Sequence, residues 1–271
     1  MLDAHPELAI PPETHFLPEL IRRFEAENVP GPTELVAAVQ THAGWHDFGL
    51  AEDELKTIFE ATDDAADAIR VFYAAYAAQH GKPRWGDKTP VYIESIAQIG
   101  AVLGNQARFL HLIRDGRDVA VSRGARAVKR GREATPAADE AETWKRRIEG
   151  AREQAQNVNH YLELRYEDLI ADPEAALRRV CEFSELEFDP AMLDYHERAS
   201  ERLAELSDLP GKGGKVRPGS ERQAAHALTS EPPRADRVAR WRTELSEDAI
   251  ADYERVAGDL LSNLGYLVVS R

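Results

Sequence analysis

Basic side chains concentrate in one segment of an otherwise acidic chain. Between residues 108 and 132 there are eight basic residues and two acidic ones. The basic residues are Arg108, Arg114, Arg117, Arg123, Arg126, Lys129, Arg130 and Arg132. Ser122 and Arg126 follow Arg114 on early turns of a predicted helix that Asp115 can cap. Backbone N–H groups at a helix N-terminus and bidentate guanidinium groups both favour phosphate-like oxygens. The pattern therefore indicates an anion site, and a solvated basic helix face explains it equally well.

The elements that must position these residues are predicted from periodicity and capping signals. Helical periods begin after pairs such as Thr89–Pro90, in which a capping residue precedes proline. The predicted helices cover 16–27, 32–41, 63–80, 90–103, 115–130, 136–157, 173–184 and 246–263. Apolar runs without this period predict strands at 108–113 and 160–165, buried in a parallel sheet, and a shorter strand at 8–10. Strands that alternate with helices predict an α/β layered domain.

Length, charge and cysteine content narrow the class of protein. The 271 residues carry 34 Lys and Arg against 48 Asp and Glu, and the net charge of −14 argues against nucleic-acid binding. We expect a single domain over 1–271, with a glycine-rich loop at about 210–222 that is either a mobile substrate gate or an ordinary surface loop. The single cysteine, Cys181, precludes an internal disulfide. No apolar run reaches membrane-spanning length and no secretory signal is recognised, so we expect a cytoplasmic protein without a membrane partner.

Five motifs resemble those of one enzyme family. Residues 109–122 (FLHLIRDGRDVAVS) resemble the 3′-phosphate-binding segment of sulfotransferases that use 3′-phosphoadenosine 5′-phosphosulfate (PAPS). The other similar segments are the acceptor-side motif of the tyrosylprotein-type branch at 11–16, the lysine-bearing turn at 85–90, the strand-end motif at 164–169 and the C-terminal segment at 238–242 with 264–266. They occur in the family's order over nearly the whole chain. The resemblance implies a P-loop-NTPase-like layered α/β fold with a parallel sheet and many helices.

The resemblance also implies two catalytic residues. Glu13 matches the general base that takes the proton of the acceptor hydroxyl, and a carboxylate suits this role if burial raises its pKa. Lys88 matches the cation near the bridging oxygen of the donor, where it would stabilise developing negative charge. From the residues alone, Glu13 is also compatible with a surface acid at a turn, and Lys88 with a surface lysine flanking a helix.

The nucleotide contacts follow from the same resemblance. Arg114 and Ser122 match the residues that bind the 3′-phosphate, and Arg126 is a supplementary contact. Tyr166 would lie near the nucleotide, and Arg240 would add a late basic contact. The family's late hydroxyl near the transferred group corresponds to Thr229 or Ser230, and both remain candidates.

One element of the family is expected to be missing. In the family, a sequence like residues 1–6 follows the first strand and the glycine- and Ser/Thr-containing loop that binds the 5′-phosphosulfate. A displaced Gly-x-x-x-x-Gly-Lys-Ser/Thr pattern does not occur in the chain. We therefore expect an N-terminally truncated sulfotransferase whose transfer activity is impaired.

Two other functions are compatible with the sequence. A non-catalytic module could bind a nucleotide or a partner through the Arg-rich segment, and a small-molecule kinase would share the layered fold. His42 and His46 are four residues apart, but Gly44 lies between them and no third ligand follows nearby, so no metal site is predicted. The leading prediction is a PAPS-dependent sulfotransferase that acts on a hydroxyl or amine of a small-molecule or peptide acceptor.

Overall fold

The structure is a computed structural model that describes residues 1–26, 30–60, 62–210 and 216–269. The chain divides into two compact units, each built from two separate stretches of sequence. Unit 1 comprises 1–107 and 187–232, and unit 2 comprises 108–186 and 233–271. The prediction of a single domain over 1–271 stays a prediction. No helix of the described residues is long and apolar enough to cross a bilayer.

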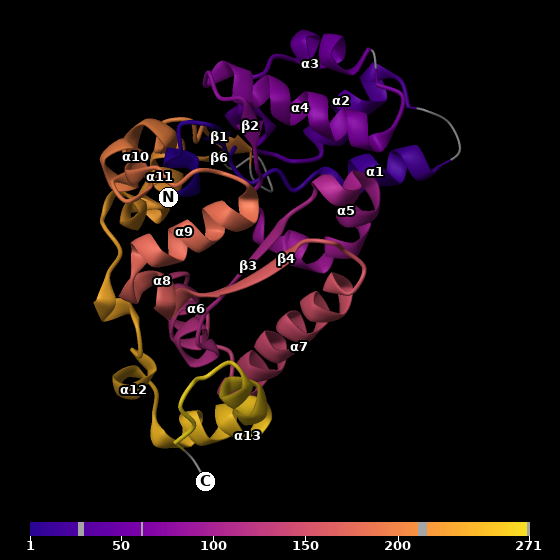
Figure 1. The fold of residues 1–271 in the computed structure, drawn as a ribbon. Coiled ribbons are helices and arrows are strands. Elements are labelled where there is room, and N and C mark those ends of the chain that lie inside the picture. Colours follow the sequence, from indigo (N-terminus) through magenta and orange to yellow (C-terminus); the bar gives the residue numbers. More distant parts are fainter. Residues whose placement is uncertain (27–29, 61, 211–215, 270–271) are drawn as a thin grey trace. The chain divides into compact units, whose positions relative to one another are not determined.

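Unit 1 is mainly helical. Its α-helices are α1 (Leu17–Glu25), α2 (Pro32–Gln40), α3 (Glu52–Phe59), α4 (Ala65–Gln79), α5 (Ile96–Leu103), α10 (Tyr195–Leu203) and α11 (Gly219–Ala225). Its 3₁₀ helices are η1 (Leu2–Ala4), η2 (Trp45–Phe48), η3 (Pro90–Glu94), η4 (Gly104–Gln106), η5 (Pro190–Met192) and η7 (Ala227–Ser230). In Figure 1, α1 to α4 gather around one core. There Phe16, Phe48 and Phe72 meet edge to face, with ring centroids 4.8 to 5.9 Å apart.

Two short parallel strands organise the part of unit 1 that carries Glu13 and Lys88. Strand β1 (Leu8–Ala9) pairs with β2 (Arg84–Trp85), with Leu8 opposite Arg84 and Ala9 opposite Trp85. Because the strands are parallel, the segments that follow them leave from the same end. This is the end at which open α/β sheets bind ligands. A second pair, β5 (Leu209–Pro210) and β6 (Val216–Arg217), is antiparallel.

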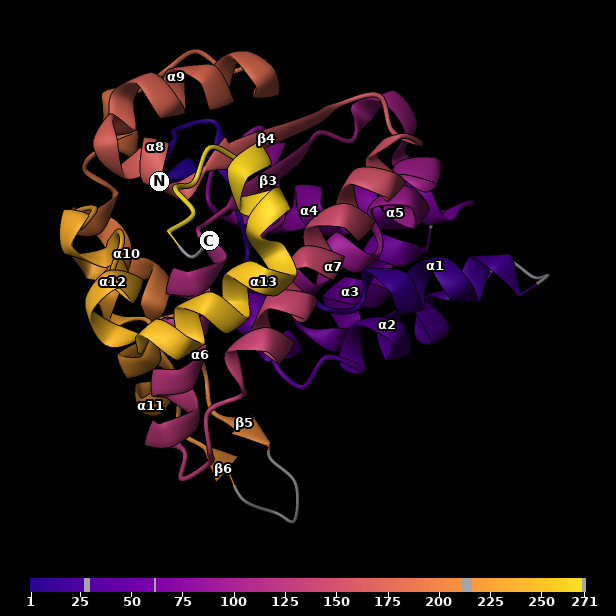
Figure 2. The same cartoon turned by 90° about the horizontal axis from the view of Figure 1, so that it is seen from below.

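Unit 2 is a parallel strand pair covered by long helices. Strands β3 (Phe109–Ile113) and β4 (Tyr161–Arg165) pair in register from Phe109 with Tyr161 to Ile113 with Arg165. The helices are α6 (Gly116–Lys129), α7 (Ala137–Ala155), α8 (Tyr166–Ala171), α9 (Pro173–Ser184), η8 (Ala235–Arg237), α12 (Trp241–Glu244) and α13 (Glu247–Asn263). Helix α13 packs against α7, as both Figure 1 and Figure 2 show. The core between them holds Ile113, Trp144, Ile148, Tyr253 and Leu261.

The α/β class and most predicted elements are confirmed. Observed helices lie within each predicted helical range, but 90–103 is split because Ser95, with φ −133°, interrupts it between η3 and α5. The prediction that the strand at 108–113 is buried was wrong in part. Strand alternation places Leu112 on the face opposite the buried Ile113, and Leu112 is 48% exposed. Helices α3, α8, α10, α11 and α12 were missed.

The predicted loop at 210–222 is only partly described. Residues 211–215 lie outside the described part of the chain, whereas β6 and the start of α11 are ordered elements within the predicted range. Helix α11 is fixed because the Gly219 N–H donates to Asp208 at 2.8 Å and the guanidinium of Arg222 pairs with the buried Asp47. The prediction of a loop was therefore wrong for residues 216–222.

Candidate active site

The two predicted catalytic residues lie together in unit 1. Glu13 follows β1 after two prolines, and Lys88 follows β2. Lys88 Nζ donates a hydrogen bond to Glu13 Oε1, although the residues are 75 positions apart. Both side chains remain accessible, with 35% of Glu13 and 60% of Lys88 exposed. The parallel pairing of β1 with β2 thus brings a carboxylate and an ammonium group to one accessible edge.

The pKa of Glu13 bears on its suitability as a base. Partial burial alone would raise this pKa, but the hydrogen bond and charge of Lys88 outweigh burial, and His15 adds a smaller effect in the same direction. The pKa of Glu13 is therefore lowered, so the condition that burial raise it is not met while Lys88 binds the carboxylate. With Lys88 in place, the carboxylate is a weaker base than an unpaired glutamate.

A buried polar network underlies the two side chains that are predicted to be catalytic. Thr14 Oγ1 donates to Asp87 Oδ2 at 2.7 Å and lies 2.8 Å from the Tyr92 hydroxyl. Tyr73 donates to the same Asp87 oxygen at 2.7 Å, and the Thr14 N–H donates to Thr89 Oγ1 at 2.9 Å. Burial raises the pKa of Asp87 despite these hydrogen bonds. Because these residues adjoin Glu13 and Lys88 in sequence, the network ties the two segments to each other.

Three predicted nucleotide residues converge in unit 2. Arg114 follows β3 and Tyr166 follows β4, so the parallel register brings them side by side. The Arg114 guanidinium carbon lies 4.9 Å from the centroid of the Tyr166 ring, and Nη1 donates to Ser122 Oγ at 3.5 Å. Arg114 Nε is buried without a hydrogen-bond partner among the described residues. The cationic guanidinium of Arg114 thus has an unused N–H donor and lies beside the Ser122 hydroxyl. This combination suits a phosphate-like anion.

The other two nucleotide candidates have local partners. Arg126 is exposed, and its Nε lies 3.4 Å from the carbonyl of Ser122. Arg240 donates to both carboxylate oxygens of Glu244, at 2.7 and 2.9 Å, and this hydrogen bonding raises the pKa of Arg240. Arg240 thus forms an ordinary helical i,i+4 pair, which a phosphate would have to displace.

Sequence reasoning missed a buried acid that organises this second set. Asp118 is fully buried and accepts hydrogen bonds from the N–H groups of Ala239, at 2.9 Å, and Trp241, at 3.0 Å. It also pairs with Arg114 at 3.4 Å and so offsets part of that residue's charge. Asp118 therefore fixes the segment that carries Arg240 against α6. The available signal was an acid four residues after Arg114 within a basic window.

The start of α6 is built on a second buried group of charges. Asp115 caps the helix as predicted, accepting from the Arg117 N–H at 2.9 Å. Arg117 is 1% exposed and binds the carboxylates of Asp115 and Glu254, with Trp241 stacked on its guanidinium at 3.6 Å. Arg117 therefore stabilises the fold. The sequence pattern did not distinguish it from the arginines that are predicted to bind an anion.

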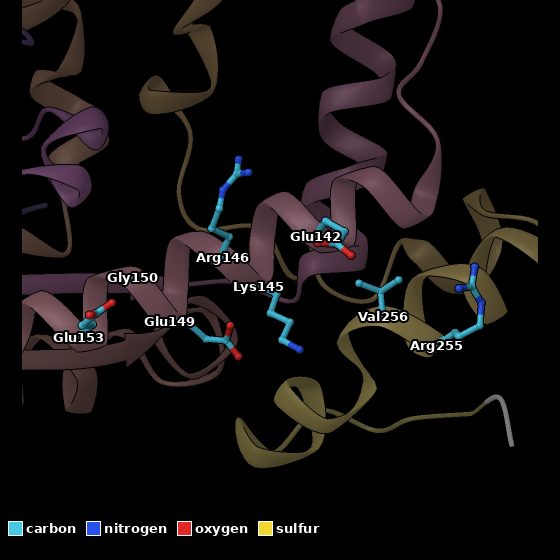
Figure 3. Close-up of a pocket in the computed structure, with 8 residues that line it drawn as sticks. All are labelled: Glu142, Lys145, Arg146, Glu149, Gly150, Glu153, Arg255 and Val256. Atoms are coloured by element: carbon cyan, nitrogen blue, oxygen red, sulfur yellow. The ribbon is translucent and has the colours of Figure 1, made fainter.

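The remaining candidates carry less chemistry. Thr229, which lies in η7 with Ser230, donates its hydroxyl to the carbonyl of His226 at 2.7 Å. No cluster of three or more metal-ligating side chains occurs in the described ranges of the chain. A surface hollow of about 540 Å³ on α7 and α13 contains no predicted site residue (Figure 3). It is lined by Glu142, Lys145, Arg146, Glu149, Gly150, Glu153, Arg255 and Val256. Three acids and three bases balance there, so the hollow is not an anion site.

Comparisons with known proteins show which sequences this chain resembles. A family model described as "Sulfotransferase family" matches residues 1–190. "Protein-tyrosine sulfotransferase A" of Caenorhabditis elegans is 26% identical over 98% of this chain and 62% of its own length. "Protein-tyrosine sulfotransferase 2" of Gallus gallus is 24% identical over 98% of the chain and 64% of its own. The chain therefore spans less than two thirds of the length of these relatives.

Solved structures share the fold. The sulfotransferase domain from the curacin biosynthetic pathway superposes with a TM-score of 0.60, at 17% identity over 99% of this chain and 92% of that chain. The sulfotransferase domain of the Synechococcus PCC 7002 olefin synthase gives a TM-score of 0.55, at 22% identity over 94% of this chain and 87% of that chain. The predicted P-loop-like α/β fold is thus confirmed.

Proposed function

Because the chain belongs to the sulfotransferase family, we propose that it transfers a sulfuryl group from PAPS to a hydroxyl or amine acceptor. The observation that carries the proposal is the contact between Glu13 and Lys88 where the segments after β1 and β2 meet. A base and a cation side by side are what proton removal and leaving-group stabilisation require. The acceptor is a small molecule or a peptide. The protein-tyrosine sulfotransferases among the relatives favour a peptide.

The nucleotide half of the proposal rests on unit 2. The Arg114 guanidinium and the nearby Ser122 hydroxyl would hold the 3′-phosphate, and the Tyr166 ring centroid lies 4.9 Å from the guanidinium carbon. Arg126 and Arg240 would add positive charge once Arg240 releases Glu244. Bidentate arginine contacts to phosphate oxygens are the stronger kind of hydrogen bond in proteins.

In the proposed reaction Glu13 accepts the O–H or N–H proton of the acceptor as the acceptor atom bonds to sulfur. PAPS supplies the sulfuryl group. The bond between sulfur and the bridging oxygen breaks, and its electron pair leaves on the 5′-phosphate oxygen beside the Lys88 ammonium. The products are the sulfated acceptor, adenosine 3′,5′-bisphosphate and one proton, which Glu13 returns to water.

Transfer of radiolabelled sulfate from PAPS to a panel of acceptors tests this proposal. Glu13→Gln should lower turnover by about 10²-fold or more, because general-base catalysis is worth about 10²–10⁴-fold. Lys88→Ala should cost about 10²–10³-fold. Lys129→Ala, on the exposed end of α6, is the matched control and should behave as the parent chain. Unchanged turnover in Glu13→Gln would show that another group removes the proton.

A non-catalytic binding module is the second candidate. It is favoured by the lowered pKa of Glu13, since the carboxylate is a weaker base while Lys88 holds it. This alternative predicts adenosine 3′,5′-bisphosphate binding by calorimetry without transfer to any acceptor.

A cytoplasmic location also remains a proposal. It is supported by the presence of a single cysteine, and a fluorescent fusion would test it.

A further inference from the structure

The Glu13 carboxylate is held from both of its oxygens. Lys88 Nζ donates to Oε1, and His15 Nε2 lies 3.2 Å from Oε2. Because a carboxylate only accepts hydrogen bonds, His15 Nε2 carries a proton in this contact. The His15 side chain is 39% exposed, so it lies at the same accessible edge as Glu13. His15 has no role in the proposed reaction.

The backbone of His15 is strained. Its φ is +57°, in the left-handed region that residues other than glycine seldom adopt. Such a conformation costs free energy and persists where surrounding contacts hold it, often at functional sites. The preceding Thr14 is fixed by the network with Asp87, Thr89 and Tyr92. Because Thr14 is fixed, the left-handed turn at the next residue directs the imidazole back toward Glu13.

A second histidine, His42, packs against the His15 ring. The ring centroids of His15 and His42 are 5.0 Å apart, and His42 lies 6.0 Å from the buried Phe48. Burial, followed by the charge of His15, lowers the pKa of His42 to about 4. His42 is therefore neutral at pH 7 and packs against His15 without competing for the carboxylate. The imidazole of His15 thus contacts both the His42 ring and the Glu13 carboxylate.

Lys88 has two partners in the proposed reaction, Glu13 and the departing phosphate oxygen. Its ammonium group carries three N–H donors and can contact both, but the negative charge that develops on the phosphate oxygen draws it away from Oε1. When it leaves, Glu13 loses its strongest partner, and the pKa of Glu13 rises toward that of a useful base. A carboxylate with no other contact would then be free to rotate.

Resting on the proposed function, we propose that His15 is the positioning residue of Glu13: it keeps the carboxylate oriented through Oε2 when Lys88 releases Oε1. The freed Oε1 is then the atom that takes the acceptor's proton. The charged or titratable groups that face this cluster are Lys88, His42 and His226. Asp47, Arg217 and Arg222 contribute to the field at His42 or His226. Among these groups, within the described residues, His15 alone hydrogen-bonds to Oε2.

Three substitutions separate this role from a structural one. His15→Gln keeps an N–H donor at a similar reach, His15→Phe keeps a ring that packs on His42 but has no donor, and His15→Gly removes the side chain and relieves the positive φ. His46→Phe is the matched control, because His46 is exposed and packs on Trp45. The substitutions are made in the 271-residue chain, in which both turnover and the titration of Glu13 are followed.

We expect kcat to fall by about 10- to 100-fold in His15→Phe and His15→Gly with KM little changed, since small errors of placement cost rates of this order. His15→Gln should retain kcat within about threefold, because it restores the hydrogen bond. His15→Gly should unfold no earlier than the parent chain, since it removes backbone strain. A purely structural role predicts the opposite for His15→Gly, namely a lower melting temperature.

The titration of Glu13 provides a readout that needs no donor. The carboxyl carbon of Glu13, followed by NMR, should titrate at higher pH in His15→Phe, because the charge and hydrogen bond of His15 both lower the pKa of Glu13. The acid limb of the kcat/KM profile should move the same way. An unchanged Glu13 titration, or a His15→Gln variant as slow as His15→Phe, would overturn the proposal. Absence of transfer by the parent chain with every acceptor would instead refute the proposed function and leave the titration to decide the contact.

Discussion

Replacing Gly116 by alanine tests how closely unit 2 is packed beneath Arg114. An added Cβ would lie 2.0 Å from the Tyr253 hydroxyl and 2.5 and 2.8 Å from two carbons of the Trp144 ring. None of these contacts fits, so a ring must move. Trp144 Nε1 donates to the carbonyl of Arg114 at 3.1 Å, so a displaced Trp144 loses that bond as well.

The expected change in the free energy of unfolding combines two destabilising effects and one stabilising effect. Overpacking a close-packed core costs about 1–3 kcal/mol. A lost hydrogen bond adds about 1 kcal/mol. Alanine recovers about 1 kcal/mol of helix propensity relative to glycine. Gly116→Ala should therefore lower the free energy of unfolding by about 1–3 kcal/mol.

Urea unfolding followed by circular dichroism measures this change. Gly150→Ala is the matched control, because Gly150 also lies in a helix of unit 2 but has open space around its Cα, and it should stabilise by up to about 1 kcal/mol. Tyr253→Phe should partly rescue Gly116→Ala, since it removes the nearest clashing atom. Alone it should stabilise by about 1 kcal/mol or more, because the Tyr253 hydroxyl has no hydrogen-bond partner among the described residues. If Gly116→Ala proved as stable as Gly150→Ala, the packing argument would be refuted.

Three further predictions concern the site and the buried charges. Arg114→Ala should weaken adenosine 3′,5′-bisphosphate binding by about 1.5–3 kcal/mol in calorimetry, while the exposed Arg132→Ala should not; equal affinities would remove Arg114 from the site. The pKa of His42 is lowered from 6.5 to about 4 in the folded chain, so the unfolded chain binds the proton first and stability should fall as pH drops from 6.5 toward 4. His42→Gln should reduce that slope in pH-dependent urea unfolding, and an unchanged slope would assign it to other groups. Arg117→Met should destabilise by about 3–5 kcal/mol in the same assay, since it leaves two buried carboxylates without their shared cation; a loss below about 1 kcal/mol would show that they are solvated.

Most of the long elements were predictable because their local signals are strong. The helix at 173–184 agrees with α9 at both ends, since Asp172 caps it and Pro173 occupies the first turn. The strands before Arg114 and Tyr166 were found because apolar runs of this length are typical of strands. Short helices such as α3 were missed because only Leu55 and Phe59 mark their buried face. Two buried positions are too few to establish a period.

The sequence predicted which residues form the candidate site, but not their contacts or the pKa of Glu13. Glu13 and Lys88 were identified from their motifs, and the structure adds that they bind each other and that the pKa of Glu13 falls. Pairing of residues so far apart depends on β1 and β2, whose two-residue lengths give almost no sequence signal. The buried Asp118 was missed for a related reason. Its partners are backbone N–H groups at 239 and 241, which no side-chain pattern reveals.

The discontinuity of unit 1 has a consequence for the newly made chain. Asp47 receives hydrogen bonds from Arg222, which lies 175 residues later. Ribosomes add about 5–20 residues per second, so Arg222 is made roughly 10–35 seconds after Asp47. The first 107 residues are completed within that interval, before all of the segment 187–232 that closes their unit has been synthesised. Unit 1 can therefore reach its final form only after that segment has been made, and the nascent chain would be exposed to chaperones and proteases until then.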